Sequence, residues 1–300
     1  MTDLPVQPRF HIGAHAFDAP ALTPGLYLVA TPIGNLGDIT LRALETLAAA
    51  QVIYCEDTRI TVRLLERYGL RVPLKALHEH NESQLVPAIL DDLRSGKAIA
   101  LVSDAGTPLI SDPGFRLVRA CAEAELPVTA LPGANAVLTA LQLSGLATDS
   151  FHFGGFLPSS DGERGRVLDG LLAGTSTVIV YESPHRLRAA VTDIAARDAA
   201  RPLAVARELT KLHEEVVRGS AGEVAAVLSA RESIKGECVI VIAGRVADDA
   251  VLDDAQIARI IADAAAALPA GKAAQQVAKL TGLPRDEAFA RIVKIKGTTP

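Results

Sequence analysis

Polar side chains gather in six short clusters that separate apolar stretches of the 300-residue chain. Each cluster ends a stretch that is expected to be a strand, and together they occupy 31–38, 56–59, 103–114, 132–136, 181–186 and 207–215. In a parallel sheet, ligands bind beyond the carboxyl ends of the strands. One such cluster is often only a turn, but six on consistent sides of two sheets indicate a binding cleft.

The longest cluster, "SDAGTPLISDPG" at 103–114, has the composition of a loop that holds a small polar ligand. Gly106 and Gly114 let the backbone come close to a ligand, and Pro108 and Pro113 stiffen the loop by fixing φ. The chain has no GxxxxGK[ST] phosphate loop, and its "GNLG" is not GxGxxG. The pattern therefore favours a nucleoside without a phosphate chain, and S-adenosylmethionine fits that description.

Apolar segments alternate with amphipathic ones from Gly25 onward, which predicts strands alternating with helices. Strands are expected at 26–31, 52–57, 73–77, 98–103 and 127–132, then at 151–156, 177–183, 202–209, 214–219 and 238–244. The first series predicts a parallel sheet with helices on both faces. In the second series, two strands follow each other with no room for a helix, which predicts an antiparallel pair in a mixed sheet.

Two residues are predicted to bound helices in the first half of the chain. Asp38 is expected to cap the helix that follows it, because its carboxylate can accept from free backbone N–H groups. The next helix is expected to begin at Thr58, and Gly69 is expected to end it as the residue just beyond its C-cap.

The composition limits the class of protein. Three hundred residues suggest two domains with a small third piece. A net charge of −5 argues against a surface that binds nucleic acid throughout, and 4% aromatic residues argue against wide base-stacking platforms. Cys55, Cys121 and Cys238 are far apart without CxxC spacing, so we expect reduced core thiols and no metal site.

No apolar stretch approaches the roughly 18 residues of a membrane span, and the start of the chain lacks a basic-then-apolar signal pattern. We therefore expect a cytoplasmic protein without a membrane partner. Residues 1–23 contain several prolines and are predicted to form a mobile tail.

The end of the chain differs from the rest in charge. Residues 254–297 predict helices, and "AAQQVAKLTGLPRDEAFARI" has the spacing of a helix-turn-helix. From Gly271 to Gly297, six basic residues stand against two acidic ones. A nucleic-acid-binding segment and a docking helical hairpin with a solvated face explain this pattern equally well.

Six segments of the chain together carry a family resemblance, namely "LYLVATPIGNLGDIT", "EDTR", "SDAGTPLISDPG", "PGANA", "YESPHR" and "ELTKLHEE". They closely resemble the family of ribosomal small-subunit (16S) RNA cytidine 2′-O-methyltransferases, within the tetrapyrrole methylase superfamily. The resemblance covers about 24–244, and more weakly the tail to Gly297.

The resemblance implies a two-lobed α/β tetrapyrrole-methylase-like fold, with a parallel-sheet lobe at 24–133 and a mixed-sheet lobe at 134–246. It implies S-adenosylmethionine folded in the cleft between the lobes, and 2′-O-methylation of a cytidine in the decoding centre of 16S rRNA. It also implies a homodimer, and a helix-turn-helix-like segment at 254–297 that helps to engage RNA.

Carried over to this sequence, the resemblance implies residues for the cofactor. Cofactor contacts are expected from Ile33, Gly34, Asp104, Gly106, Thr107, Ala134, Asn135, Tyr181 and Ala206. Substrate contacts are expected from Arg59, Arg186, Lys211, Lys272, Lys279, Arg285 and Arg291. A guanidinium group matches the oxygen atoms of a phosphate, which suits Arg59 and Arg186 to flanking phosphates of RNA.

A 2′-hydroxyl is a poor nucleophile until its proton has an acceptor, and a general base tuned toward neutral pH would help. The candidates are Glu56, Asp57, Glu182 and His185. Each has an alternative role: Glu182 as an anchor for Arg186 or a turn, His185 as a helix cap, and Glu56 with Asp57 as a helix N-terminal pair. Positioning without a dedicated base is a further alternative.

Three rival functions remain at the level of sequence. A tetrapyrrole methyltransferase or a diphthine-type protein methylase would share the scaffold, but neither explains the basic tail or the segments "ESPHR" and "ELTKLHEE". A non-catalytic nucleoside-binding regulator that uses its tail on DNA belongs to a different class. The density of titratable groups in the clustered loops argues against it.

Overall fold

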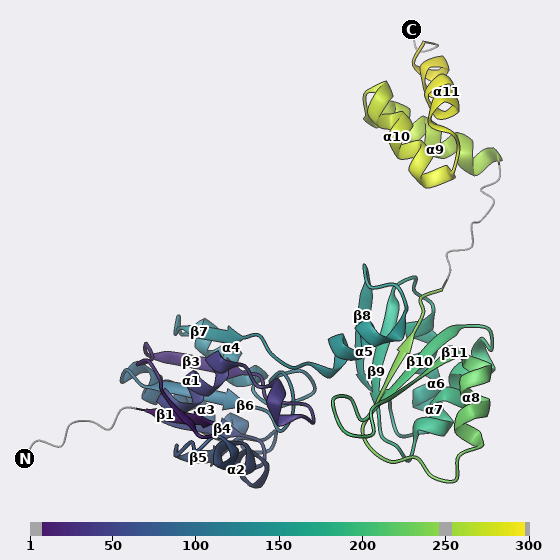
Figure 1. The fold of residues 1–300 in the computed structure, drawn as a ribbon. Coiled ribbons are helices and arrows are strands. Elements are labelled where there is room, and N and C mark those ends of the chain that lie inside the picture. Colours follow the sequence, from purple (N-terminus) through teal and green to yellow (C-terminus); the bar gives the residue numbers. More distant parts are fainter. Residues whose placement is uncertain (1–7, 246–253, 298–300) are drawn as a thin grey trace, which may run out of the picture. The chain divides into compact units, whose positions relative to one another are not determined.

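The computed structural model describes residues 8–245 and 254–297. Within these residues, the part up to Gly244 forms one compact unit and the part from 254 on a second one (Figure 1). No helix in the described part of the chain is long and apolar enough to cross a membrane.

The first sheet contains five parallel strands in the order β5-β4-β6-β3-β7. They are β3 (Gly25–Val29), β4 (Val52–Cys55), β5 (Leu74–Ala76), β6 (Ala98–Val102) and β7 (Val128–Leu131). Successive strand residues face opposite sides, so Tyr27 packs in one core cluster and Leu26 in the other. This confirms the predicted parallel sheet, with all five strands near their expected positions.

Helices cover both faces of this sheet. One face packs against α1 (Leu41–Ala49) and α2 (Thr58–Arg67), and the other against α3 (Glu82–Arg94) and α4 (Phe115–Glu123). Gly69, with φ 66°, follows the C-cap of α2 as predicted. The expected cap at Asp38 is wrong: Asp38 belongs to the short 3-10 helix η1 (Leu36–Asp38), and the Thr40 hydroxyl caps α1 by accepting from the Ala43 N–H.

A hairpin precedes the first sheet. β1 (Arg9–Ile12) pairs antiparallel with β2 (His15–Asp18). The Phe10 side chain is 2% exposed and belongs to a core cluster of the first lobe, and the His11 N–H donates to the Tyr68 carbonyl at 2.8 Å. The expectation of a mobile tail is therefore wrong for residues 9–18, because one buried aromatic ring ties the segment to the core. Residues 1–7 lie outside the described residues.

The second sheet is mixed, in the order β11-β10-β12-β9-β8. Its strands are β8 (Phe151–Phe156), β9 (Thr177–Glu182), β10 (Pro202–Arg207), β11 (Glu215–Ser220) and β12 (Cys238–Ile242). β10 pairs antiparallel with both β11 and β12, which confirms the predicted antiparallel pair. Because β12 is antiparallel to β9 as well, β9 and β10 end at the same edge of the sheet.

Helices pack on both faces of the second sheet too. α6 (Asp161–Leu172), α7 (Leu187–Arg197) and α8 (Ala221–Ser229) share a core cluster with one face. α5 (Ala136–Ser144) packs on the other, in a cluster that also contains Ile33 from the first lobe. Ile33 therefore joins the two lobes of the first unit.

The second unit consists of α9 (Asp254–Ala267), α10 (Ala270–Thr281) and α11 (Arg285–Gly297). Gly282, with φ 71°, ends α10 in the left-handed conformation and makes the turn into α11. The three helices share a small core of alanine and β-branched side chains, including Ile261, Val277 and Ile292. The predicted helix-turn-helix is confirmed, with α9 as a third helix packed against it.

Candidate active site

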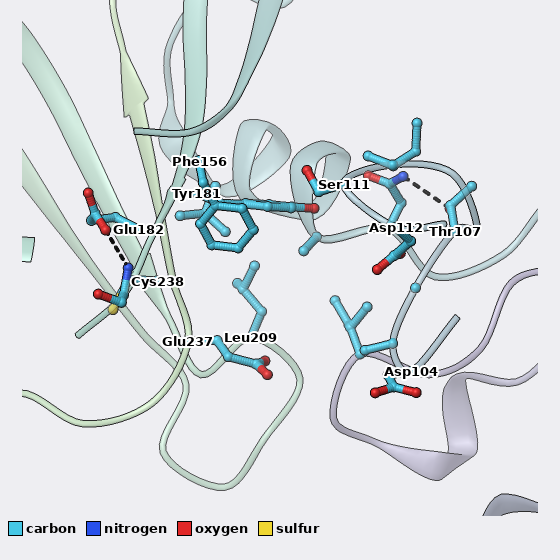
Figure 2. Close-up of a pocket in the computed structure, with 18 of the residues that line it drawn as sticks. Asp104, Thr107, Ser111, Asp112, Phe156, Tyr181, Glu182, Leu209, Glu237 and Cys238 are labelled. Carbon is cyan, nitrogen blue, oxygen red and sulfur yellow. Dashed lines mark hydrogen bonds between the residues drawn. The ribbon is translucent and has the colours of Figure 1, made fainter. Parts of the chain in front are cut away.

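A pocket of about 370 Å³ opens where the strand-end loops of the two lobes meet. The first lobe contributes the loops after β3, β6 and β7, and the second the ends of β9 and β10 and the start of β12 (Figure 2). Its wall consists of Ile33, Asp104, Ala105, Gly106, Thr107, Ile110, Ser111, Asp112, Asn135, Ala136, Phe156, Tyr181, Glu182, Ser183, Pro184, Leu209, Glu237, Cys238 and Val239. The volume falls within the range of small-molecule sites.

The loop 103–114 is held in an unusual conformation. Gly106, at φ 83°, exchanges both backbone hydrogen bonds with Thr31 at 2.9 Å, which clamps this loop to the one after β3. Leu109 and Ser111 also have positive φ, at 73° and 67°, although neither is glycine. Non-glycine residues in this region carry strain, and such strain is concentrated at functional sites. The backbone conformations at Gly106, Leu109 and Ser111 therefore shape one wall of the pocket.

A hydrogen-bond network joins this loop to the turn after β7. The Thr107 hydroxyl donates to the Ala134 carbonyl at 3.2 Å and accepts from the Asn135 amide at 3.1 Å (Figure 2). The Asn135 side-chain oxygen caps α5 by accepting from the Leu138 N–H at 3.0 Å. Thr107 and Asn135 thus fix each other while both line the pocket.

Tyr181 forms the opposite wall. Its ring packs edge-on against Phe153 and Phe156, with centroids 4.9 and 5.3 Å away, and its hydroxyl end points toward the loop that carries Ser111 and Asp112 (Figure 2). Burial, with a smaller contribution from the negative charge of Asp112, raises the pKa of Tyr181 to about 12. The phenol therefore stays protonated at neutral pH and can donate a hydrogen bond.

The loop after β10 completes this wall. Glu208 and Thr210 have positive φ, at 52° and 65°. Lys211 is paired within the loop region, with its ammonium group 2.8 Å from Glu208 and 3.1 Å from Glu237. A Cβ on Gly34 would lie 2.5 Å from the Lys211 side chain, so Gly34 is the residue that lets the two lobes approach here.

Carboxylates give the wall its charge. Asp104 and Asp112 lie on the first lobe's side, and no Lys, Arg or His is among the described residues that line the pocket. Burial raises the pKa of Asp104, against a hydrogen bond from the Asp57 N–H at 2.9 Å that lowers it. Burial, and next the charge of Glu56, raise the pKa of Asp112 to about 6, while a hydrogen bond from Ser103 lowers it. The pocket therefore suits a cationic ligand.

Most of the predicted cofactor residues meet at this pocket. Those on the wall are Ile33, Asp104, Gly106, Thr107, Asn135 and Tyr181. Gly34 packs against Lys211, Ala134 contributes a carbonyl to the Thr107 network, and Ala206 is buried in the core behind the wall. Gly34 and Ala134 are thus next in sequence to wall residues, and Ala206 lies in the layer of side chains behind the wall.

The side chains from Tyr181 to Arg186 do not all face the pocket. Glu182 follows Tyr181 on β9 and faces the opposite side of the sheet, where its side chain has no exposed surface. The Glu182 carboxylate accepts from the Arg186 guanidinium at 2.7 Å and from the Ser183 N–H at 2.7 Å. Arg186 also donates to the Leu157 carbonyl at 3.2 Å. Glu182 and Arg186 are thus placed as an anchored pair.

The other predicted base candidates lie away from the wall. His185 is exposed and follows Pro184 out of the pocket. Asp57 caps α2 and binds the exposed Arg59, whose hydrogen bonds lower the pKa of Asp57 to about 2. Burial raises the pKa of Glu56, which is half-buried beside Asp104. None of these three residues lines the pocket.

Several pocket residues were not predicted as site residues from the sequence. Asp112 stands inside the longest motif, whose spacing could have marked it, and Phe156 ends a predicted strand. Leu209 stands in the predicted cluster 207–215. Glu237, Cys238 and Val239 carry no comparable signal, because the pairing of β12 with β9 brings them to the wall.

The predicted RNA contacts of the second unit share one property, which is exposure. Lys272, Lys279, Arg285 and Arg291 are all exposed, and Arg291 pairs with Glu287 at 2.6 Å. The remaining three predicted substrate contacts belong to the first unit: Arg59 is exposed, whereas Arg186 and Lys211 are paired within the protein.

Comparison with known proteins agrees with this geometry. Residues 25–225 match the family model of tetrapyrrole (corrin/porphyrin) methylases, and residues 251–296 match that of the RsmI C-terminal HTH domain. A ribosomal RNA small subunit methyltransferase I of Mesorhizobium japonicum is 44% identical over 96% of this chain and 98% of its own length. A protein of the same name from Escherichia coli O157:H7 is 44% identical over 91% of this chain and 96% of its own.

Solved structures show the same fold at low identity. Uroporphyrin-III C-methyltransferase from Thermus thermophilus aligns with a TM-score of 0.52 and 19% identity, covering 73% of this chain and 94% of that one. Diphthine synthase aligns with a TM-score of 0.56 and 16% identity, covering 73% and 90%. The fold alone is thus shared with methylases of quite different acceptors. Because the chain is 44% identical to these relatives over most of its length and matches both family models, it belongs to the ribosomal RNA small subunit methyltransferase I family of tetrapyrrole methylases.

Proposed function

We propose that this methyltransferase transfers a methyl group from S-adenosylmethionine to the ribose 2′-hydroxyl of a cytidine in the decoding centre of 16S rRNA. The observation that carries the proposal is full-length identity to relatives named ribosomal RNA small subunit methyltransferase I, combined with a pocket that lacks a phosphate cradle. The identity supports an rRNA acceptor, and the choice of cytidine and of the 2′-oxygen rests on the family resemblance.

The pocket fits S-adenosylmethionine on physical grounds. Ile33, Ile110, Leu209 and Val239 provide apolar surface for a nucleoside, and the acidic wall attracts a ligand with cationic groups. A phosphate chain would meet carboxylates with no cation on the described wall. When bound, S-adenosylmethionine supplies an activated methyl group on a positively charged sulfur. One structural neighbour, a uroporphyrin-III C-methyltransferase, was solved with S-adenosyl homocysteine.

The wall residues that we assign to this ligand hold it from two sides. Asp104 and the backbone of Gly106 face it from the loop after β6, and Thr107 and Asn135 support that loop. The protonated Tyr181 faces it from the second lobe with a hydroxyl donor. Residues from both lobes close around one small ligand, so water is excluded from the reacting atoms and the acceptor can be held in line.

RNA binding is assigned to basic side chains outside the pocket. Lys272, Lys279 and Arg285 are exposed on the second unit, where they can reach phosphate oxygens. Arg59, whose side chain is 88% exposed, stands at the carboxyl edge of the first sheet beside Asp104's loop and can do the same. Charge in the net-acidic chain is thus divided, with carboxylates at the pocket and cations on the RNA-facing surfaces.

Assembly and location complete the proposal. We assign a homodimer and a cytoplasmic location, in line with the family resemblance and with an rRNA acceptor. Size-exclusion chromatography with light scattering measures the assembly, and a monomer at the concentration of full activity would remove the homodimer from the proposal.

Labelled methyl transfer tests the function. Purified protein and labelled S-adenosylmethionine are incubated with small ribosomal subunits whose RNA lacks the modification, and the labelled nucleotide is then mapped. A 2′-O-methylated cytidine in the decoding centre is the expected product. Label on free tetrapyrrole or on protein alone would favour the two scaffold-sharing rivals. Ligand binding without transfer to any acceptor would favour a nucleoside-binding regulator.

A further inference from the structure

Asp112 is a half-buried carboxyl group on the pocket wall, and none of the assignments above gives it a role in the chemical step. It follows Ser111, whose φ is 67°, and precedes Pro113, so its backbone is fixed on both sides. The residue lies on the wall between Asp104 and Tyr181 (Figure 2). A stiff, partly strained loop thus holds this carboxyl group at the surface where substrate atoms must arrive.

The other carboxyl groups on the wall have different engagements. Asp104 accepts the backbone N–H of Asp57 at 2.9 Å. The Glu182 side chain is sealed from the pocket and paired with Arg186 at 2.7 Å. Glu237 is mostly exposed and pairs with Lys211 at 3.1 Å. Asp112 accepts a hydrogen bond from Ser103 and forms no ion pair among the described residues, so its carboxylate keeps acceptor positions for a ligand.

We propose that Asp112 is the catalytic residue that accepts the proton of the ribose 2′-hydroxyl during methyl transfer. This inference rests on the proposed function, because it requires a hydroxyl acceptor. The O–H bond of the acceptor breaks and its proton passes to the Asp112 carboxylate. The electron pair of the oxygen forms the new O–C bond, and the pair of the C–S bond remains on sulfur, which becomes a neutral thioether. The carboxylic acid then releases the proton to water.

The surroundings of Asp112 suit it to this task. The groups that face it are Glu56 just after β4, Ser103 and Asp104 in its own loop, and Tyr181 on β9. Two are carboxylates, and the phenol keeps its proton because its pKa is about 12. Burial and these charges raise the pKa of Asp112 to about 6, so the group is ionised at pH 7 and still basic enough to take a proton.

Asp112→Asn tests the proposal, because asparagine keeps the shape and removes the basic oxygen. With cofactor and modification-free subunits saturating, the single-turnover rate is expected to fall about 100-fold or more. The affinity for S-adenosylmethionine, measured by calorimetry without RNA, is expected to stay within about threefold. Wild type should lose rate as the pH falls through about 6, where the carboxylate becomes protonated, and the variant should lose this limb.

Glu56→Gln is the matched variant, since it changes a charge next to Asp112 without touching the pocket wall. Removing that negative charge lowers the pKa of Asp112, so the acidic limb should move to lower pH. A loss of rate in Glu56→Gln with an intact rate in Asp112→Asn would assign the base to Glu56 and overturn the proposal.

Two further outcomes would also overturn it. An equal loss of cofactor affinity and rate in Asp112→Asn would make Asp112 a cofactor ligand. An unchanged rate and pH profile would leave positioning as the source of catalysis. If the wild-type protein methylates no hydroxyl group, the proposed function fails. If the wild-type protein and Asp112→Asn are equally active, only the role of Asp112 fails, so the two results can be told apart. Equal unfolding midpoints for the two proteins verify that the variant folds.

Discussion

Single residues decide the shape of this pocket through backbone conformation as much as through side chains. Gly106 is the clearest case, since its φ of 83° lies where other residues are strained and its two hydrogen bonds to Thr31 join two loops. A Cβ at this position would also lie 3.2 Å from Ile33, another residue of the wall. The glycine is thus required for both conformation and space.

Gly106→Val is therefore expected to weaken binding of S-adenosylmethionine by about tenfold or more, the equivalent of about 1.4 kcal/mol, because the loop must shift to relieve strain. Asp104→Ala should weaken it in the same direction. Calorimetry on the free protein measures both. Gly162→Ala, at a helical position where a Cβ meets nothing within 4 Å, is the control. Unchanged affinity in both site variants would remove this loop from the cofactor site.

Arg186 is expected to act on stability and not on RNA. Its guanidinium group neutralises the fully buried Glu182, and removal of one partner leaves a buried charge. Arg186→Ala should lower the free energy of unfolding by roughly 3 kcal/mol. Glu182→Gln, which keeps the shape, should cost less. Denaturant unfolding measures both. Unchanged stability with a raised apparent KM for subunits would instead make Arg186 an RNA contact.

At the scale of elements, the ends of the strands determine where the loops that line the pocket lie. The loops after β3, β6 and β7 reach one edge because the strands run parallel. The second lobe reaches the same pocket because β9 and β10 end where β12 begins. The order of strands in space, and not their order along the chain, therefore determines which loops share a ligand.

The hairpin β1–β2 is expected to be part of the fold of the first lobe. Phe10→Ala should lower the free energy of unfolding by about 3 kcal/mol, because it empties a site that is 2% exposed. Phe17→Ala is the matched variant: Phe17 stacks on Phe10 with centroids 5.4 Å apart but is 44% exposed, so its loss should be clearly smaller. If a denaturant titration shows a negligible effect for both variants, the hairpin does not contribute to the stability of the first lobe.

At the scale of the whole molecule, the chain divides its work between two compact units with separate cores. The first contains the pocket with its acidic wall, and the second presents exposed basic side chains on three helices. In this acidic chain, these cations therefore belong to a different unit from the pocket that suits a cationic ligand. This separation predicts that RNA affinity and chemistry can be changed independently.

Replacing Lys272, Lys279 and Arg285 together by alanine should weaken binding of small subunits and leave the affinity for S-adenosylmethionine unchanged. Each phosphate contact that is lost should reduce the slope of log affinity against log salt by about 0.7–0.9. Filter binding at several salt concentrations measures this slope. Arg119→Ala, on α4 and paired with Glu123 at 2.8 Å, is the control for a general loss of positive charge. An unchanged slope in the triple variant would make the second unit a structural appendage.

The sequence by itself determined the strands, the parallel and mixed sheets, the helix-turn-helix and the family, because these depend on local periodicity, turn residues and long motifs. It also located part of the pocket wall, since strand-end loops of a parallel sheet must share an edge. Tertiary structure decided which of these polar groups face the ligand. Glu182 and Tyr181 are neighbours in sequence, yet pleating sends one under Arg186 and the other into the pocket.

Burial and distant neighbours explain the remaining differences. Asp112 differs from Asp104, the other aspartate of its motif, through its surroundings, which a single sequence does not specify, and these set its pKa. Phe10 ties residues 9–18 to the core through one aromatic ring, too little for a local pattern to reveal. Chemistry at the site follows from desolvation and charge across the lobes, and these exist only after the chain has folded.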